Sequence, residues 1–326
     1  MTSPSPAAPA PEAGAGATPD RADRPDRPDR LARFRPWTRG VLLANVIGQI
    51  LIIGTGGAVR LTDSGLGCST WPMCEPGHFT PVFHEASSIH SFVEFGNRTM
   101  TGVLSVIGVV LLVLVWTDRR RSESYRALGI VPLAGVLTQA VIGGVVVLLH
   151  LHPGWVSLHF GVSVALVWFS AYLLHRHGEG DGPPQRIAGR GIATVGALLG
   201  LLLIPVVTLG VLVTGSGPHS GDDTVGYRLA LDPLTMTRAH SESVWLFLAT
   251  LVVLLVLLHR TTTSPRVAAA RKAAWVLLAV ALAQGLVGYV QYFTGLPELL
   301  VGVHLVGAGC LAWATANAVL RLRTRA

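Results

Sequence analysis

The stretch QAVIGGVVVLLHLHPGWVSLH, residues 139–159, recurs in altered form as QGLVGYVQYFTGLPELLVGVH, residues 284–304. Both copies begin with Gln, place Gly four residues later, turn at a Pro, and close with His after the same interval. Each copy spans the end of one apolar segment, a short turn and the start of the next segment. A repeat of this length indicates that the chain contains two copies of one helical unit.

Apolar runs dominate this 326-residue chain, in which 50% of residues are hydrophobic and only 13% are charged. Eight such runs lie near 40–59, 99–117, 127–149, 155–175, 192–214, 240–259, 273–293 and 298–320. Each is long enough to cross a hydrocarbon core of about 30 Å. The sequence therefore predicts an all-α integral membrane protein with eight transmembrane helices. We expect two tandem four-helix bundles related by pseudo-twofold symmetry, since an even number of helices gives both copies the same orientation.

The basic residues predict how the chain is oriented. All but four of the 25 Lys and Arg residues lie in segments that share one side of the membrane, the exceptions being Arg60, Arg98, Arg228 and Arg238. This asymmetry predicts cytoplasmic N- and C-termini. It also accounts for the net charge of +7, so we infer no nucleic-acid partner. We divide the chain into a disordered cytoplasmic tail (1–38), an N-terminal half (39–175), a cytoplasmic linker (176–191), a C-terminal half (192–320) and a second cytoplasmic tail (321–326).

Histidines recur near the outer ends of the even-numbered helices. His159 and His304 are repeat mates in the fourth and eighth helices, and His90 and His240 lie at the entrances of the second and sixth. A planar iron porphyrin takes one imidazole on each face, which two facing helices in each half can supply. The alternative is a set of buried histidines bonded to neighbouring carbonyls. Packing alone gives no reason for the doubling, so we favour haem ligation.

An acidic residue lies beside the first pair of histidines. Glu94 follows His90 by four residues and precedes Arg98 by four. An ionisable group inside a membrane span is a functional candidate, and a salt bridge with Arg98 is the competing structural explanation. The position four residues after His240 is Val244, so the second copy lacks the acid. This difference predicts one reacting haem and one structural or electron-carrying haem.

Two cysteines, Cys68 and Cys74, share the first outer loop in GLGCSTWPMC. An oxidising compartment permits a disulfide between them. A metal site is the competing interpretation, although a pair of this spacing without further thiols is weak evidence for zinc. His219, in TGSGPHSGDD, is an outer-loop residue and a candidate to contact a haem propionate.

These features together resemble the haem A synthase family, over about residues 40–320. The resemblance rests on GGAVRLTDSGLGCSTWPMC, VEFGNR, WVSLHF, TGSGPHSGD and LLVGVHL. It implies an oxidoreductase of the bacterial cell membrane that oxidises the C8 methyl of haem O to a formyl group, giving haem A. It assigns the substrate haem to the N-terminal half and a bound haem B to the C-terminal half. It also implies that Cys68 and Cys74 pair and that Glu94 is catalytic.

The second helix departs from the family pattern Glu-x-x-His-Arg, because the chain reads EFGNR from Glu94 to Arg98. By depth, Asn97 occupies the expected ligand position, and His90 lies about two turns, or 10 Å, higher on nearly the same face. Either His90 ligates through a loop that folds down, or the reacting haem has His159 alone and an open face. The predicted site comprises His90, His159, His240 and His304 as axial ligands, Glu94 as the catalytic residue, and Asn97, Arg98 and His219 around them.

The expected reaction is two successive hydroxylations followed by loss of water, with Glu94 as a general base or proton relay. A membrane b-type cytochrome that takes electrons from quinol would share the bis-histidine sites. A repeat-built transporter would place its polar residues near the midplane, whereas here they cluster toward one face. The expected partners are the lipid bilayer, a haem O synthase that delivers substrate, an electron acceptor that the sequence does not name, and a second copy in a homo-oligomer.

Overall fold

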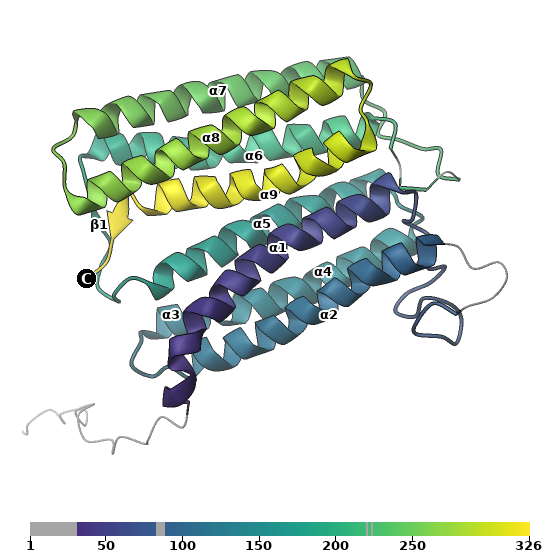
Figure 1. Ribbon diagram of the computed structural model, residues 1–326, viewed down its shortest axis with the longest axis horizontal. Coiled ribbons are helices and arrows are strands. Elements are labelled where there is room, and N and C mark those ends of the chain that lie inside the picture. The colour runs from purple at the N-terminus through teal and green to yellow at the C-terminus, as the bar shows by residue number, and fades with distance from the viewer. Residues whose placement is uncertain (1–30, 83–88, 220, 223) are drawn as a thin grey trace, which may run out of the picture. The chain divides into compact units, whose positions relative to one another are not determined.

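The computed structural model describes residues 31–82, 89–219, 221–222 and 224–326, so most of the predicted N-terminal tail lies outside the described residues (Figure 1). Its helices are η2 (Ala32–Trp37), α1 (Thr38–Leu61), α2 (Ile89–Trp116), α3 (Glu123–Ala127), α4 (Ile130–Leu148), α5 (Pro153–His177), α6 (Arg190–Ser216), α7 (Pro233–Arg260), α8 (Pro265–Phe293) and α9 (Glu298–Leu320). Two short strands, β1 (Gln185–Arg186) and β2 (Arg323–Thr324), complete the described elements.

Within the described residues, eight helical segments are long and apolar enough to cross a membrane, as the sequence predicts. Helices α2, α7 and α8 begin well before the corresponding apolar runs, because polar first turns extend them. Asp232 caps α7 by accepting a hydrogen bond from the Thr235 N–H, and Ser264 caps α8 in the same way through Val267. A proline follows each cap at the first helical position, where its missing N–H costs nothing. Hydropathy alone therefore underestimates the length of these helices.

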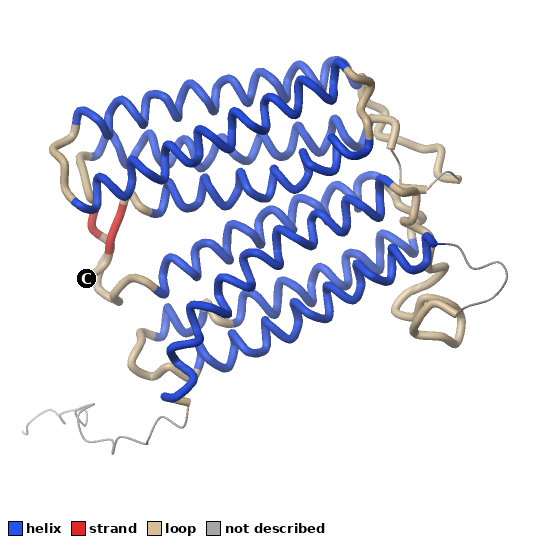
Figure 2. Tube along the Cα trace, in the orientation of Figure 1, coloured by secondary structure: helices blue, strands red, loops and turns tan. Residues whose placement is uncertain are grey.

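The helices pack in two neighbouring groups, α1, α2, α4 and α5 in one and α6–α9 in the other (Figure 2). Helix α9 joins them, since it packs against both α1 and α5. Small residues allow the close approach between α1 and α9: a Cβ added at Gly57 would lie 3.1 Å from the Leu305 side chain, and one added at Gly309 would lie 3.1 Å from that of Ile53. Small residues at helix contacts are typical of membrane proteins, because van der Waals packing drives their association.

The sequence repeat is matched by repeated local geometry. The Gln139 side chain donates a hydrogen bond to the His159 carbonyl at 2.9 Å, and the Gln284 side chain donates to the His304 carbonyl at 3.0 Å. Leu151 and Leu296, 145 residues apart like the histidines, both adopt left-handed backbone with φ of 59° and 60°. These paired contacts support two tandem copies, and the pseudo-twofold axis between them stays a prediction.

The linker and the C-terminal tail pair with each other, which the sequence did not predict. Strands β1 and β2 are antiparallel, and the Gly182 N–H donates to the Ala326 carbonyl at 2.9 Å. The pairing satisfies backbone groups that lie beyond the ends of the membrane-spanning helices. This short ladder is the one departure from an all-α fold among the described residues.

Asp181 connects the linker to the turn that follows α2. Its carboxylate accepts hydrogen bonds from the Arg121 guanidinium at 2.9 Å, from the Ser122 N–H at 2.8 Å and from Arg176 at 3.2 Å. The hydrogen bond from Arg121, the largest contribution, lowers the pKa of Asp181 well below its usual value. The charged form is therefore the form that stabilises this end of the fold.

Replacing Asp181 tests this connection. Asp181→Asn is expected to lower the free energy of unfolding by about 1–3 kcal/mol at neutral pH, because it weakens charge-assisted hydrogen bonds. A depressed folded-state pKa stabilises the fold above the unfolded pKa and ceases to do so as the pH falls. The difference between variant and wild type should therefore shrink below about pH 4. Thermal unfolding in detergent measures it. Asp232→Asn, which keeps a capping side chain, is the control. An equal loss of unfolding free energy in both variants would contradict the role assigned to Asp181.

Candidate functional site

A cavity of about 1210 Å³ lies among the helices and is lined by residues from all eight membrane-spanning segments. Its wall is mainly apolar, with a few polar side chains that include Gln49, Gln139 and Gln284. Typical ligand pockets measure about 300–1,000 Å³. This cavity therefore has room for a large apolar ligand, or for more than one.

Three of the four predicted histidines lie on this wall: His159 from α5, His240 from α7 and His304 from α9. The ring of His240 hydrogen-bonds through Nδ1 to the Val206 carbonyl at 3.0 Å, so that nitrogen is the donor and Nε2 is unprotonated in the neutral ring. Nδ1 of His159 and Nδ1 of His304 are buried and have no hydrogen-bond partner among the described residues. On both rings Nε2 is not among these buried atoms and forms no hydrogen bond within the described residues, so Nε2 is the nitrogen that a ligand in the cavity can reach, as on His240.

Each of these imidazoles lies against a glycine of a neighbouring helix. A Cβ added at Gly143 would lie 3.3 Å from Cε1 of His159, and one added at Gly288 would lie 3.3 Å from Cε1 of His304. A Cβ added at Gly210 would lie 3.1 Å from Cε1 of His240. Gly143 and Gly288 are the glycines that the sequence repeat places four residues after its Gln. The repeat revealed these positions, and only the structure shows that they seat the rings.

Asn97, and not His90, occupies the cavity wall on α2. The Asn97 side chain accepts a hydrogen bond from the Thr55 hydroxyl at 2.7 Å and lies near Gly56, as His240 lies near Gly210. His90 instead hydrogen-bonds to the Ser64 hydroxyl through Nδ1 at 2.8 Å, in the first turn of α2. The structure therefore brings His159, His240 and His304 together on one cavity and leaves His90 outside it.

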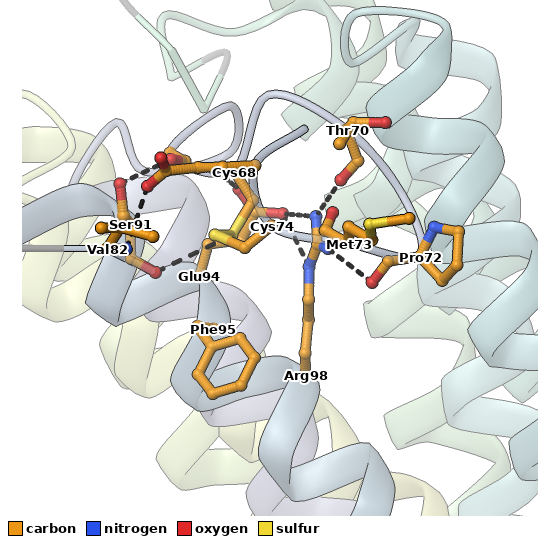
Figure 3. The surroundings of a disulfide bond; sticks show 12 residues. Cys68, Thr70, Pro72, Met73, Cys74, Val82, Ser91, Glu94, Phe95 and Arg98 are labelled. Carbon is orange, nitrogen blue, oxygen red and sulfur yellow. Dashed lines mark hydrogen bonds and ion pairs between the residues drawn. A yellow bond between two sulfur atoms is a disulfide. The ribbon is translucent and has the colours of Figure 1, made fainter. Parts of the chain in front are cut away.

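Glu94 is buried under the first outer loop (Figure 3). It is 4% exposed, and its carboxylate accepts hydrogen bonds from the Cys68 N–H at 2.7 Å and from Nε of Arg98 at 3.1 Å. Arg98 also donates to the carbonyls of Thr70 and Met73 at 3.0 and 3.1 Å. The salt bridge weighed against a catalytic role is thus present, and neither Glu94 nor Arg98 lies on the cavity wall.

The two loop cysteines form the expected disulfide, Cys68–Cys74. The chain between them approaches α4 closely, since a Cβ added at Gly144 would lie 2.5 Å from the indole ring of Trp71. The disulfide, Arg98 and Trp71 together fix this segment against the N-terminal half, as Figure 3 shows for the first two.

Sequence reasoning gave no role to Arg60, which lies on the cavity wall. Its guanidinium donates to the Thr214 carbonyl at 2.9 Å and to the His219 carbonyl, while its Nε is buried without a partner. The sequence feature that could have identified Arg60 is its position among the few basic residues at the outer ends of the helices. The His219 ring bonds to the Leu296 carbonyl at 3.0 Å and is not on the wall.

Residues 39–219 match the family model COX15-CtaA, described as cytochrome oxidase assembly protein. The chain belongs to this family. The matched residues include the disulfide loop, Glu94, Asn97 and His159, and they end before His240 and His304. Those two histidines are connected to the family match by the internal repeat.

Curated relatives point in the same direction. The chain is 35% identical over 137 residues to the haem A synthase of Lysinibacillus sphaericus, covering 40% of this chain and 41% of that one. It is 36% identical over 130 residues to the haem A synthase of Bacillus pumilus, covering 38% and 39%. Over 149 residues it is 27% identical to that of Halalkalibacterium halodurans, covering 44% and 48%. The chain thus spans less than half the length of each of these relatives.

The position of Asn97 on the cavity wall can be tested by spectroscopy. Asn97→His is expected to place a second imidazole opposite His159 and to convert the iron of an N-terminal haem to a six-coordinate, low-spin form. His90→Ala should leave the haem spectrum unchanged, because His90 lies off the cavity. Absorption and electron paramagnetic resonance spectra of the purified variants measure both effects. Loss of a haem signal in His90→Ala would return His90 to the ligand set.

Proposed function

We propose that the chain is a haem A synthase, an oxidoreductase that converts haem O to haem A by oxidising the C8 methyl to a formyl group. The observation that supports this most is the cavity with three partly buried imidazoles, each against a glycine, two of them at repeat-related positions. The family match and the names of the relatives support the same activity.

The C-terminal half fits a bound haem B. His240 and His304 come from different helices and both reach the cavity wall, which is the donor set that a bis-imidazole iron porphyrin takes. The Val206 carbonyl fixes the tautomer of His240, so that Nε2 carries the lone pair that can bind a metal ion. We assign these two histidines as the axial ligands of haem B.

The N-terminal half fits the substrate haem O, with His159 as its protein ligand. Asn97 and Thr101 from α2 and Ser163 from α5 also line this part of the wall. The iron porphyrin, when bound, supplies the redox chemistry, and the protein supplies position and exclusion of water. An asparagine opposite a single histidine leaves one face of the site without a strong ligand.

Glu94 is proposed to act as a general base or proton relay for this half. Its carboxylate is held at the end of α2 by Arg98 and by the Cys68 N–H, three residues from Asn97 on the same helix. These contacts also anchor the disulfide loop, so a positioning role competes with proton transfer. Variants at Glu94 separate the two roles.

The membrane arrangement completes the proposal. We place the protein in a bacterial cell membrane with both termini cytoplasmic, which puts the Cys68–Cys74 disulfide on the oxidising side. The cavity lies toward that side, since its wall includes Arg60, Pro218 and Phe293. Haem O then arrives from the membrane or from a haem O synthase, and electrons leave to an acceptor still to be identified.

Removing one C-terminal ligand tests the assignment of haem B. His304→Ala is expected to lose the low-spin haem B signal in a pyridine haemochrome assay and to form little haem A. His259→Ala is the matched control, because that ring bonds within its own helix at the opposite end of α7. A wild-type protein that is colourless after expression in haem-replete cells, or a His304→Ala variant with unchanged haem, would refute the proposal.

Replacing the acid tests proton transfer. Glu94→Gln keeps the size of the side chain but removes the charge and one of the two acceptor oxygens, so either the Cys68 N–H or the Arg98 guanidinium loses its acceptor. It is expected to lower haem A formation about 100-fold or more. Haem content and the disulfide should persist in this variant. Glu242→Gln, an exposed acid on α7, is the control. Undiminished haem A in extracts from cells supplied with haem O argues for a positioning role alone.

A further inference from the structure

The cavity reaches the outside of the helix bundle between α7 and α8. Every exposed residue of its wall in the described chain lies on one of these two helices, except Pro218 and Gly226 in the loop between α6 and α7. The α7–α8 slot is bordered by Leu234, Arg238, Trp245, Leu282, Leu286 and Tyr289. Wall residues contributed by α1, α2, α4 and α5 are all buried or only partly exposed.

This slot opens at membrane depth. Trp245 is 12 residues into α7 from Pro233, and Leu282 is 11 residues before the end of α8 at Phe293. At 1.5 Å per residue the slot extends roughly 16–18 Å along the helices, which is more than half of a hydrocarbon core of about 30 Å. Trp245 and Leu286 are 60% and 67% exposed, so the slot faces lipid.

The corresponding seam of the N-terminal half is closed. Gly144 on α4 is the repeat counterpart of Tyr289 on α8, 145 residues later. The indole of Trp71 covers Gly144, and the segment that contains Trp71 is held by Arg98 and the disulfide. Tyr289, by contrast, is 47% exposed. Leu137 and Val141, the counterparts of Leu282 and Leu286, are exposed but do not line the cavity. The seam is therefore covered at Gly144 in one copy, and in the other it opens from the cavity to lipid.

The side chains of the slot suit an amphiphilic planar ligand. Trp245 on α7 and Tyr289 on α8 offer aromatic faces on the two sides of the slot. Arg238 lies on the wall near the outer end of the slot, where it is exposed. A guanidinium at that depth matches carboxylates that stay at the interface while an apolar ring system enters the bilayer core.

We infer that the α7–α8 slot is a lateral portal through which a carboxylate-bearing tetrapyrrole passes between the bilayer and the His240–His304 pair. Trp245 and Tyr289 border the portal, and Arg238 holds the carboxylates during passage. The inference rests on the proposed function, because it takes the ligand of these two histidines to be a haem.

Exchange kinetics test the portal. The full-length protein, purified from haem-replete or haem-limited cells and placed in lipid nanodiscs, is mixed with vesicles that are haem-free or loaded with haemin. Loss or gain of the bis-imidazole Soret band reports release and uptake. Trp245→Ala is expected to speed both by about 2- to 10-fold, since it removes the indole that borders the slot on α7. Leu246→Ala is the matched control, because Leu246 is the next residue, is 55% exposed and is not on the wall.

A reversible lock provides the second test. The double variant Ser241→Cys with Tyr289→Cys can be cross-linked across the slot by a thiol-specific reagent with a reducible linker. Cross-linking should slow uptake and release at least as strongly as Trp245→Ala speeds them, and cleavage should restore both rates. Each single variant under the same treatment controls for effects on Cys68–Cys74.

The outcomes separate the portal from the proposed function. Haem that binds normally but exchanges at wild-type rates in Trp245→Ala and in the cross-linked double variant would overturn the portal and leave the function intact. A faster release with unchanged uptake would also overturn it, because a portal changes both rates while weaker binding changes release. Wild-type protein that takes up no haem from either source would overturn both.

Discussion

Backbone polar groups inside a bilayer have to be satisfied within the protein, and this constraint shapes everything else in the chain. It makes each apolar segment a helix and leaves side-chain packing to decide how the helices meet. Glycines then allow the close contacts, as Gly57 and Gly309 do between α1 and α9. In such a setting three imidazoles on one cavity wall are conspicuous, and the cavity is the place where a ligand can reach the Nε2 atoms of His159, His240 and His304.

The two copies of the repeat share local contacts but differ in the residues that surround the repeat-related histidine. In both copies a glutamine side chain donates a hydrogen bond to the carbonyl of the repeat-related histidine. In both, the turn before that histidine contains a leucine with left-handed backbone. The N-terminal copy adds a loop that is fastened by Glu94, Arg98 and the disulfide. The C-terminal copy has a second imidazole instead, and its corresponding seam faces lipid. In the proposed ligation, the covered site has one histidine ligand and the laterally open site has two.

This asymmetry bears on how such a protein could divide its work. A covered site excludes water from a reacting group, which favours chemistry that generates charge or reactive species. An open, doubly ligated site favours retention of an iron porphyrin by coordination more than by enclosure. The substitution of Asn97 for the expected histidine makes the contrast sharper in this chain, since it removes the strong donor from the covered site.

The sequence by itself determined the eight spans, the repeat, the disulfide and three of the cavity histidines, because these depend on hydropathy, spacing and residue type. It also recorded both explanations of Glu94 without choosing between them. The sequence did not predict the start of each capped helix, the β1–β2 pairing or the connection through Asp181. These features depend on contacts that hydropathy and spacing do not show. Only the tertiary structure decided that His90 lies off the cavity and Asn97 on it, because the loop that carries Ser64 binds the His90 ring. Only it placed Trp71 over one seam and left the other uncovered, since that depends on how a loop folds back onto helices and not on any local pattern.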